Sequence, residues 1–194
     1  FSSRRRHTRY ISVTGVQTCA LPISNCPRNA FYHARELTFY ERWDEAIKYL
    51  LKYLEMPGAT WANERCYAMR LLGKSHEHIG DHWQAEKWYR AACAESPGTR
   101  EPWVDLAMFS YMKADWSQCY FCVQKALEIK DKALVYTMDP SVWTEKPYDL
   151  GGIAAWHLGH KEEAIQFCQK ALEFNPSDPR LLRNLEMMTE GDHA

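Results

Sequence analysis

The chain has 194 residues, of which 46% are hydrophobic and 13% aromatic, and it carries 24 basic and 25 acidic residues. This much apolar and aromatic side-chain content predicts an ordered globular chain and excludes an intrinsically disordered one. No apolar run approaches the ~20 residues that a helix needs to cross a bilayer, so we expect no membrane span.

The first 24 residues differ in composition from the rest of the chain. They hold Arg4, Arg5, Arg6 and Arg9, no acidic residue and no helical apolar stripe. A basic targeting or nuclear signal is one interpretation. The string also resembles translated sequencing-adapter DNA found at the ends of unrelated sequences, and we expect residues 1–24 to be such a non-native segment. The remaining residues have five more acidic than basic side chains, which gives no electrostatic reason to bind nucleic acid.

A repeat with a period of 34 residues organises residues 25–190. Ala85 aligns with Cys119 and Gly73 with Ala107, and Pro97 closes the first of these two units. The other matched pairs are Met69 and Trp103, Leu72 and Leu106, Tyr89 and Val123, and Ala92 and Ala126. This order of small, aromatic and proline positions resembles the tetratricopeptide (TPR) repeat, in which each unit is a pair of amphipathic helices.

The repeat extends in both directions. Ala46 lies 39 residues before Ala85, and Ala164 lies 45 residues after Cys119, so insertions of 5 and 11 residues fall within 56–60 and 130–147. Loops between helix pairs tolerate such insertions. We therefore predict an all-α, TPR-type α-solenoid of four helix pairs over residues 25–190. A last helix from about Pro179 caps it, and residues 191–194 form a tail.

Cap residues mark the predicted turns inside the helix pairs. Asp44, Asp81 and Asp115 precede second helices and are expected to be N-caps, because a short carboxylate accepts from free N–H groups of the first turn. Gly80 and Gly159 stand at the ends of first helices, where a left-handed backbone is easiest for glycine.

The TPR resemblance implies that the first helix of each unit lines a concave groove. That groove is expected to bind a peptide, a protein or a glycan acceptor, because aromatic and Met side chains beside Arg and Lys suit binding. The alternatives are packing on the last helix, packing on a missing catalytic domain, and ordinary surface. The groove residues predicted by the register are Phe31, Arg35, Phe39, Tyr67, Arg70, Lys74, His78, Val104, Met108, Tyr111, Met112, Asp149, Ile153, Trp156 and His157.

A carboxylate clamp, by which some TPR proteins grip the C-terminal tails of chaperones, needs Lys and Asn at set groove positions. The Asn positions here hold Arg35, Lys74, Met108 and Ile153, so we expect no such clamp.

Cysteine use predicts a reduced, cytoplasmic protein. The seven cysteines are scattered through predicted helices, as small apolar residues, instead of forming a dense loop framework. Cys119 and Cys122 form a Cys-x-x-Cys motif, but no second pair lies at zinc-finger spacing. Cys119 also occupies the small-residue position of its unit, so buried packing is the favoured interpretation.

No residue set predicts catalysis or metal binding. His76, His78 and His82 straddle a helix end with no acidic ligand placed beside them. Glu64 and Glu101 begin helices, where a negative charge is favoured, so we expect capping and no catalytic role.

Three sequence segments resemble the C-terminal helical region of family 2 glycosyltransferases. They are RNAFYHAREL at 28–37, WANER at 61–65 and SPGTREPW at 96–103, and the resemblance covers about 160 residues. It implies an upstream nucleotide-sugar-binding α/β domain with a metal-binding Asp-x-Asp motif. This chain has no Asp-x-Asp, so nucleotide sugar and divalent metal are expected only in that missing domain. A truncated glycosyltransferase is thus one setting, and a free-standing TPR adaptor is the alternative.

Overall fold

A computed structural model describes residues 26–132 and 135–190, and within those ranges the chain is helical with no strand. The helices are α2 (Pro27–Phe39), α3 (Trp43–Glu55), α4 (Ala62–His78), α5 (His82–Glu95), α6 (Arg100–Met112), α7 (Trp116–Glu128), the 3-10 helix η2 (Pro140–Trp143), α8 (Glu145–His157), α9 (Lys161–Phe174) and α10 (Pro179–Glu190). The predicted non-native segment 1–24 and tail 191–194 lie outside the described residues.

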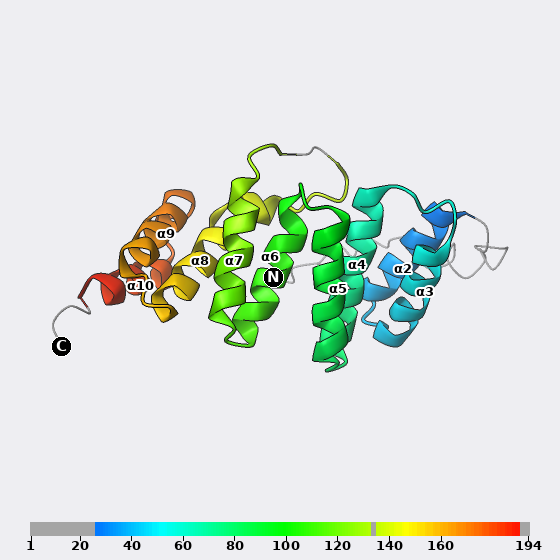
Figure 1. The fold of residues 1–194 in the computed structure, drawn as a ribbon, viewed down its shortest axis with the longest axis horizontal. Helices are drawn as coiled ribbons and strands as arrows, with labels where there is room; N and C mark the ends of the chain where they lie inside the picture. The colour runs from blue at the N-terminus through cyan, green and yellow to red at the C-terminus, as the bar shows by residue number, and fades with distance from the viewer. Residues whose placement is uncertain (1–25, 133–134, 191–194) are drawn as a thin grey trace, which may run out of the picture.

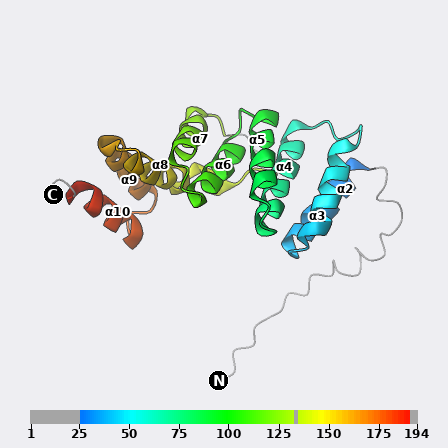
Figure 2. The same cartoon turned by 60° about the horizontal axis from the view of Figure 1, so that its bottom comes forward.

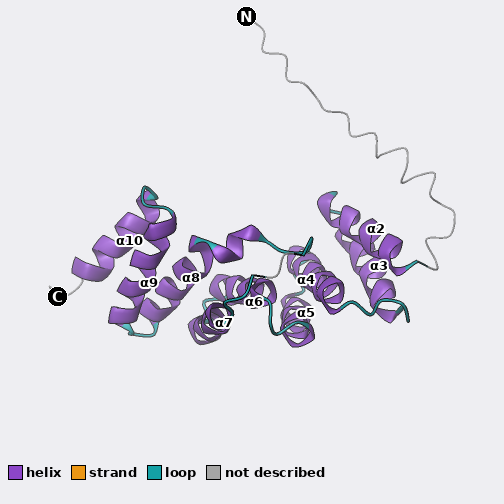
Figure 3. Cartoon of the chain, turned by 90° about the horizontal axis from the view of Figure 1, so that it is seen from above, coloured by secondary structure: helices purple, strands orange, loops and turns teal. Residues whose placement is uncertain are grey.

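The helices form four antiparallel pairs that stand side by side, and α10 packs on α9 at the end of the row (Figures 1 and 2). Seen from above, the row is an arc with α2, α4, α6 and α8 on its inner side (Figure 3). The predicted all-α solenoid of four pairs and a terminal helix is therefore confirmed. We call the side that carries these four first helices the inner face.

The turn inside each pair has the same backbone conformation. Gly80 and Gly159 have φ of +80° and +79°, as the sequence predicted, while Glu41 and Ala114 adopt φ of 56° and 55° at the matching positions. In each turn the next N–H donates to a carbonyl five residues earlier, for example from Asp81 at 2.9 Å. This bond satisfies a carbonyl that the helix end leaves free.

The N-cap prediction holds at two of three positions. Asp81 and Asp115 accept hydrogen bonds from the backbone N–H groups of the residues three further on, at 3.1 and 3.0 Å. The prediction for Asp44 is wrong, because α3 begins at Trp43 and its N-cap is Arg42. Asp44 instead lies in the first turn, where the helix dipole favours a carboxylate.

Small side chains allow the two helices of a pair to approach closely. Ala46, Ala85, Cys119 and Ala164, which share one position of the repeat, are each fully buried. Since interiors are close-packed, a larger residue at this position would separate the helices.

Residues 135–144 of the longer insertion lie along the inner face, beside α6 and α4 (Figure 3). Arg100 anchors the insertion: Nη1 donates to the carbonyl oxygen of Val142 at 3.4 Å, and the guanidinium carbon lies 3.9 Å from the Trp143 ring centroid. The backbone N–H of Asp139 donates to Glu101 at 3.2 Å. These contacts hold the 135–144 segment against the first turn of α6.

Candidate functional site

A cleft of about 250 Å³ opens on the inner face between α2, α4 and α6. We call it the inner cleft. It is lined by Thr38, Phe39, Tyr67, Arg70, Leu71, Lys74, Glu77, Tyr89, Asp105, Met108, Phe109 and Asp139.

The wall of the inner cleft contains a nearly buried ion pair. Arg70 is 9% exposed, and its Nε donates to the Asp105 carboxylate at 2.6 Å. The guanidinium carbon also lies 5.3 Å from the Tyr67 ring centroid. Burial alone would lower the pKa of Arg70, but the Asp105 charge raises it, so the pair stays ionised. The two residues are 35 apart, close to one repeat, which places them on adjacent first helices.

Three more charged side chains line the same cleft. Lys74 is exposed, and Glu77 accepts a hydrogen bond from the Tyr89 hydroxyl at 2.8 Å. Burial opposes ionisation of Asp139, yet hydrogen bonds from Ser141 lower the pKa of Asp139 overall. Three carboxylates therefore face two cations, and the inner cleft carries no excess of positive charge.

Apolar side chains on α2 and α6 also line the cleft. Phe39, the last residue of α2, is 63% exposed, and Met108 on α6 is half-buried. Exposed aromatic and methionine side chains beside fixed polar groups can hold a peptide side chain and orient its main chain.

The structure brings together five of the predicted groove residues in this cleft: Phe39, Tyr67, Arg70, Lys74 and Met108. Arg35 lies next to them on α2, with its guanidinium 5.6 Å from the Phe39 ring. Phe31 and Val104 are corrections, since both are fully buried and support the inner face from beneath without lining it.

His78 and His157 connect neighbouring units. His78 stacks on Trp43 with ring centroids 4.1 Å apart, and His157 stacks on Trp116 at 4.0 Å. Each tryptophan begins the second helix of one unit, and each histidine ends the first helix of the next unit. These histidines therefore contribute to the joints of the solenoid, and neither lines the inner cleft.

The remaining predicted residues lie further along the array. Met112 is 66% exposed, while Tyr111 and Ile153 are half-buried. Trp156 packs in a cluster with Met188 of α10, as in the alternative of packing on the last helix. The Asp149 carboxylate accepts a hydrogen bond from Nη1 of Arg180 on α10, at 2.7 Å.

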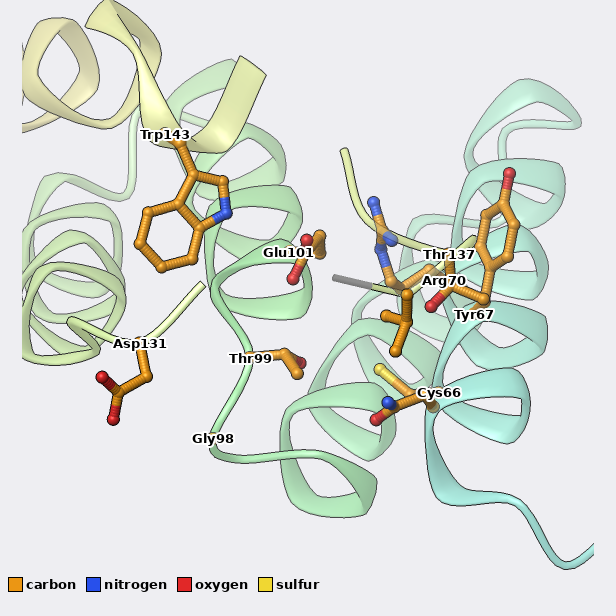
Figure 4. A pocket seen from close by; sticks show the side chains of 11 residues that line it. Cys66, Tyr67, Arg70, Gly98, Thr99, Glu101, Asp131, Thr137 and Trp143 are labelled. Carbon is orange, nitrogen blue, oxygen red and sulfur yellow. The ribbon is translucent and has the colours of Figure 1, made fainter. Parts of the chain in front are cut away.

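A second, smaller cavity of about 20 Å³ lies between α4, α6 and the insertion (Figure 4). Tyr67 and Arg70 line both cavities, so the two are neighbours. Trp143 and Thr137 of the insertion cover the smaller one (Figure 4). Its volume is that of about one water, too little for a ligand.

The cysteines and histidines flagged in the sequence do not converge on a metal. Cys119 and Cys122 are buried and unpaired, and burial raises the pKa of each thiol to about 12. His76 approaches Asp81 at 3.7 Å, whereas His82 faces Phe109. Across residues 26–132 and 135–190, no group of three His, Cys, Asp or Glu side chains could hold a metal ion.

Glu64 and Glu101 have partners that the sequence did not indicate. Glu64 is 7% exposed and accepts hydrogen bonds from the hydroxyls of Tyr53 and Tyr136. Glu101 accepts from the insertion backbone, as described above. Both carboxylates lie in the first turn of their helices, as the sequence predicted, and they also tie distant segments together.

Family models for the tetratricopeptide repeat match residues 33–99 and 148–178, together half of the chain. No curated protein matches the sequence. None of the helices that the structure describes is both long and apolar enough to cross a membrane.

Solved structures share the fold at low sequence identity. A crystal structure of MamA superposes with a TM-score of 0.67 at 18% identity, covering 85% of this chain and 81% of that one. PilF of Pseudomonas aeruginosa gives 0.66 at 12% identity, covering 92% and 72%. The first TPR of Spaghetti (RPAP3), bound to the HSP90 peptide SRMEEVD, gives 0.56 at 14% identity, covering 68% and 98%.

Proposed function

Because this chain belongs to the tetratricopeptide-repeat proteins, we propose that it is a protein-interaction module whose inner cleft binds a short peptide segment of a partner. The observation that carries the proposal is the inner cleft itself, where exposed Phe39 and Lys74 flank the fixed Arg70–Asp105 pair.

The dimensions of the inner cleft fit one or two peptide side chains. Its volume of about 250 Å³ is more than ten times that of the smaller cavity, which has room for about one water. Phe39 and Met108 supply apolar contact for an anchor side chain. The Arg70–Asp105 pair is already formed, so binding does not have to order it first, and a pre-organised wall lowers the cost of association.

The charge of the cleft argues against an acidic ligand. The solved RPAP3 domain holds the acidic peptide SRMEEVD. In this chain Glu77, Asp105 and Asp139 line the cleft, and Lys74 and Met108 stand where a carboxylate clamp needs Asn. Like charges in a partly buried site disfavour binding. We therefore propose a ligand with an apolar anchor and no net negative charge.

We propose two kinds of protein to which the module could belong. The phrases at 28–37, 61–65 and 96–103 favour the C-terminal part of a family 2 glycosyltransferase, with the nucleotide sugar and metal held by another domain. A free-standing adaptor accounts for the fold equally well. The gene sequence upstream of the Asn25 codon distinguishes them, because only the first setting requires an α/β domain with an Asp-x-Asp motif there.

A random-peptide display selection on the purified chain tests the proposed function. We expect enriched peptides with a shared apolar position, and at least tenfold weaker binding of these peptides to Phe39→Ala and Met108→Ala. Trp83→Ala is the matched control, since Trp83 is 70% exposed on α5, away from the inner cleft. No enrichment, or equal losses in all three variants, contradicts the proposal.

A further inference from the structure

Tyr136 of the insertion docks on the first two helix pairs. Its ring centroid lies 5.3 Å from that of Trp61 and 6.1 Å from that of Tyr32, and its hydroxyl donates to the Glu64 carboxylate. Tyr136 is 72 residues from Glu64 in the sequence. The position that receives it, between Tyr32, Trp61 and Glu64, is not formed by the insertion.

Glu64 is held ready for a hydroxyl donor. It is 7% exposed, and its other oxygen accepts from the buried Tyr53 hydroxyl at 2.9 Å. Burial and the hydrogen bond to Glu64 raise the pKa of Tyr136, so the phenol keeps its proton. Two aromatic walls and one carboxylate at the far end match the shape and polarity of a phenol. A phenylalanine ring in the same position would leave the Glu64 oxygen without a hydrogen-bond donor. Such a loss weakens the binding of phenylalanine relative to tyrosine.

The Arg35 side chain on α2 lies between this position and Phe39 of the inner cleft. The Arg35 guanidinium carbon lies 4.8 Å from the Tyr32 ring and 5.6 Å from the Phe39 ring, so it joins the two. Tyr32 and Phe39 are seven residues apart on one helix, which is about 10 Å at 1.5 Å per residue. An extended peptide spans that distance in about three residues.

We propose that Tyr32, Trp61 and Glu64 form a tyrosine-binding subsite at the end of the inner cleft, and that the chain fills it with its own Tyr136. A partner peptide places a tyrosine there, about three residues from its apolar anchor, and displaces Tyr136. The inference rests on the proposed function, since the partner peptide is the ligand of the inner cleft.

Occupation by Tyr136 makes the subsite a competition between two tyrosines. A tethered group has an effective concentration in the millimolar range. Tyr136 is 43% exposed, so it can leave without opening the core. Removal of its side chain is therefore expected to increase the affinity of tyrosine-containing ligands, whereas a purely structural tyrosine would only lower stability.

The test uses the chain's own sequence as the probe, an acetylated and amidated Val-Tyr-Thr tripeptide copied from residues 135–137. It is titrated into wild type and Tyr136→Ala while the indole N–H resonance of Trp61 is followed by NMR. We expect a saturable shift in Tyr136→Ala at millimolar probe. Binding to wild type is expected to be roughly twofold weaker, because a tethered Tyr136 at millimolar effective concentration competes with a millimolar ligand. The Val-Phe-Thr tripeptide is the matched control and is expected to bind more weakly than the tyrosine probe.

Equal shifts in the two proteins, or no shift in Tyr136→Ala, overturn the inference. If the alanine variant fails to fold, Tyr136→Phe replaces it, because phenylalanine keeps the ring contacts. This variant is expected to bind the probe with an affinity between those of wild type and Tyr136→Ala. Binding equal to that of wild type would also overturn the inference. The display selection separates the two proposals. If the selected peptides bind the inner cleft but contain no tyrosine, the proposed function is supported and the tyrosine subsite is contradicted.

Discussion

The contact between Gly73 and Tyr89 gives the sharpest test of how the helix pairs pack. A Cβ added at Gly73 would lie 2.7 Å from two carbon atoms of the Tyr89 ring, about 1 Å closer than an ordinary carbon contact. The ring has little room to move, because it is 5% exposed, its hydroxyl donates to Glu77, and its centroid lies 5.5 Å from that of the Phe109 ring.

Two effects of opposite sign decide the outcome of Gly73→Ala. Alanine in a helix interior is favoured over glycine by about 1 kcal/mol. Overpacking a rigid core costs about 1–3 kcal/mol. Because the clash is with a ring that is held in place and not with the end of a flexible chain, we expect the cost to prevail, with net destabilisation of up to about 2 kcal/mol.

Urea unfolding followed by circular dichroism measures this difference. Gly152→Ala is the matched control, because Gly152 is also buried within a helix but its added Cβ would meet its nearest atoms at 3.4–3.6 Å. We expect that control to be neutral or stabilising. The next unit has Ala107 and Val123 at the matching positions, so Tyr89→Val added to Gly73→Ala should show a favourable coupling energy. Stabilisation by Gly73→Ala alone would refute this packing argument.

Three further predictions concern a charge pair, a turn and a titration. Asp105→Ala leaves Arg70 without its partner and is expected to lower the free energy of unfolding in urea by about 3 kcal/mol. The control Glu45→Ala breaks an exposed pair of similar length and is expected to lower it by less than about 1 kcal/mol. Equal losses of stability in the two variants would contradict the role of burial. Gly80→Ala meets no atom within 4 Å but must keep φ at +80°, so a loss of about 1 kcal/mol is expected, and no loss would contradict a left-handed turn. Burial, and then the charge of Arg42, lower the pKa of His33 in the folded protein. Between that lowered pKa and pH 6.5, His33 therefore binds more protons in the unfolded chain than in the folded one. The free energy of unfolding thus falls as the pH drops from 6.5 towards the folded pKa. His33→Phe should flatten stability against pH in that window, and an unchanged slope would contradict this assignment.

The fold was predictable because the repeat constrains it at every position. The 34-residue spacing places small residues such as Ala85 and Cys119 where helices touch, and Gly80 and Asp81 mark a turn by local backbone chemistry. These signals depend on neighbours within one unit, so they can be read without a structure. Asp44 shows their limit, because a two-residue shift in the start of α3 turns an N-cap into a first-turn carboxylate.

The site was predictable only in part. Helical spacing identifies the helix face on which a residue lies but not how deeply the next unit covers it. It therefore places Phe31 in the groove, although Phe31 is buried. The Arg70–Asp105 pair could have been found from opposite charges about one repeat apart. Nothing local to Tyr136 indicates that it reaches Glu64, because that contact depends on the path of the whole insertion.

Site-specific photo-cross-linking tests the central claim most directly. A photoreactive amino acid is placed at Lys74, in the inner cleft, or at Lys87, exposed on α5, and the protein is irradiated with a display-selected peptide. A peptide held in the inner cleft predicts cross-links from position 74 and none from position 87, with unlabelled peptide suppressing the product. Cross-linking from position 87 alone, or equally from both positions, would contradict the assignment of the inner cleft as the binding site.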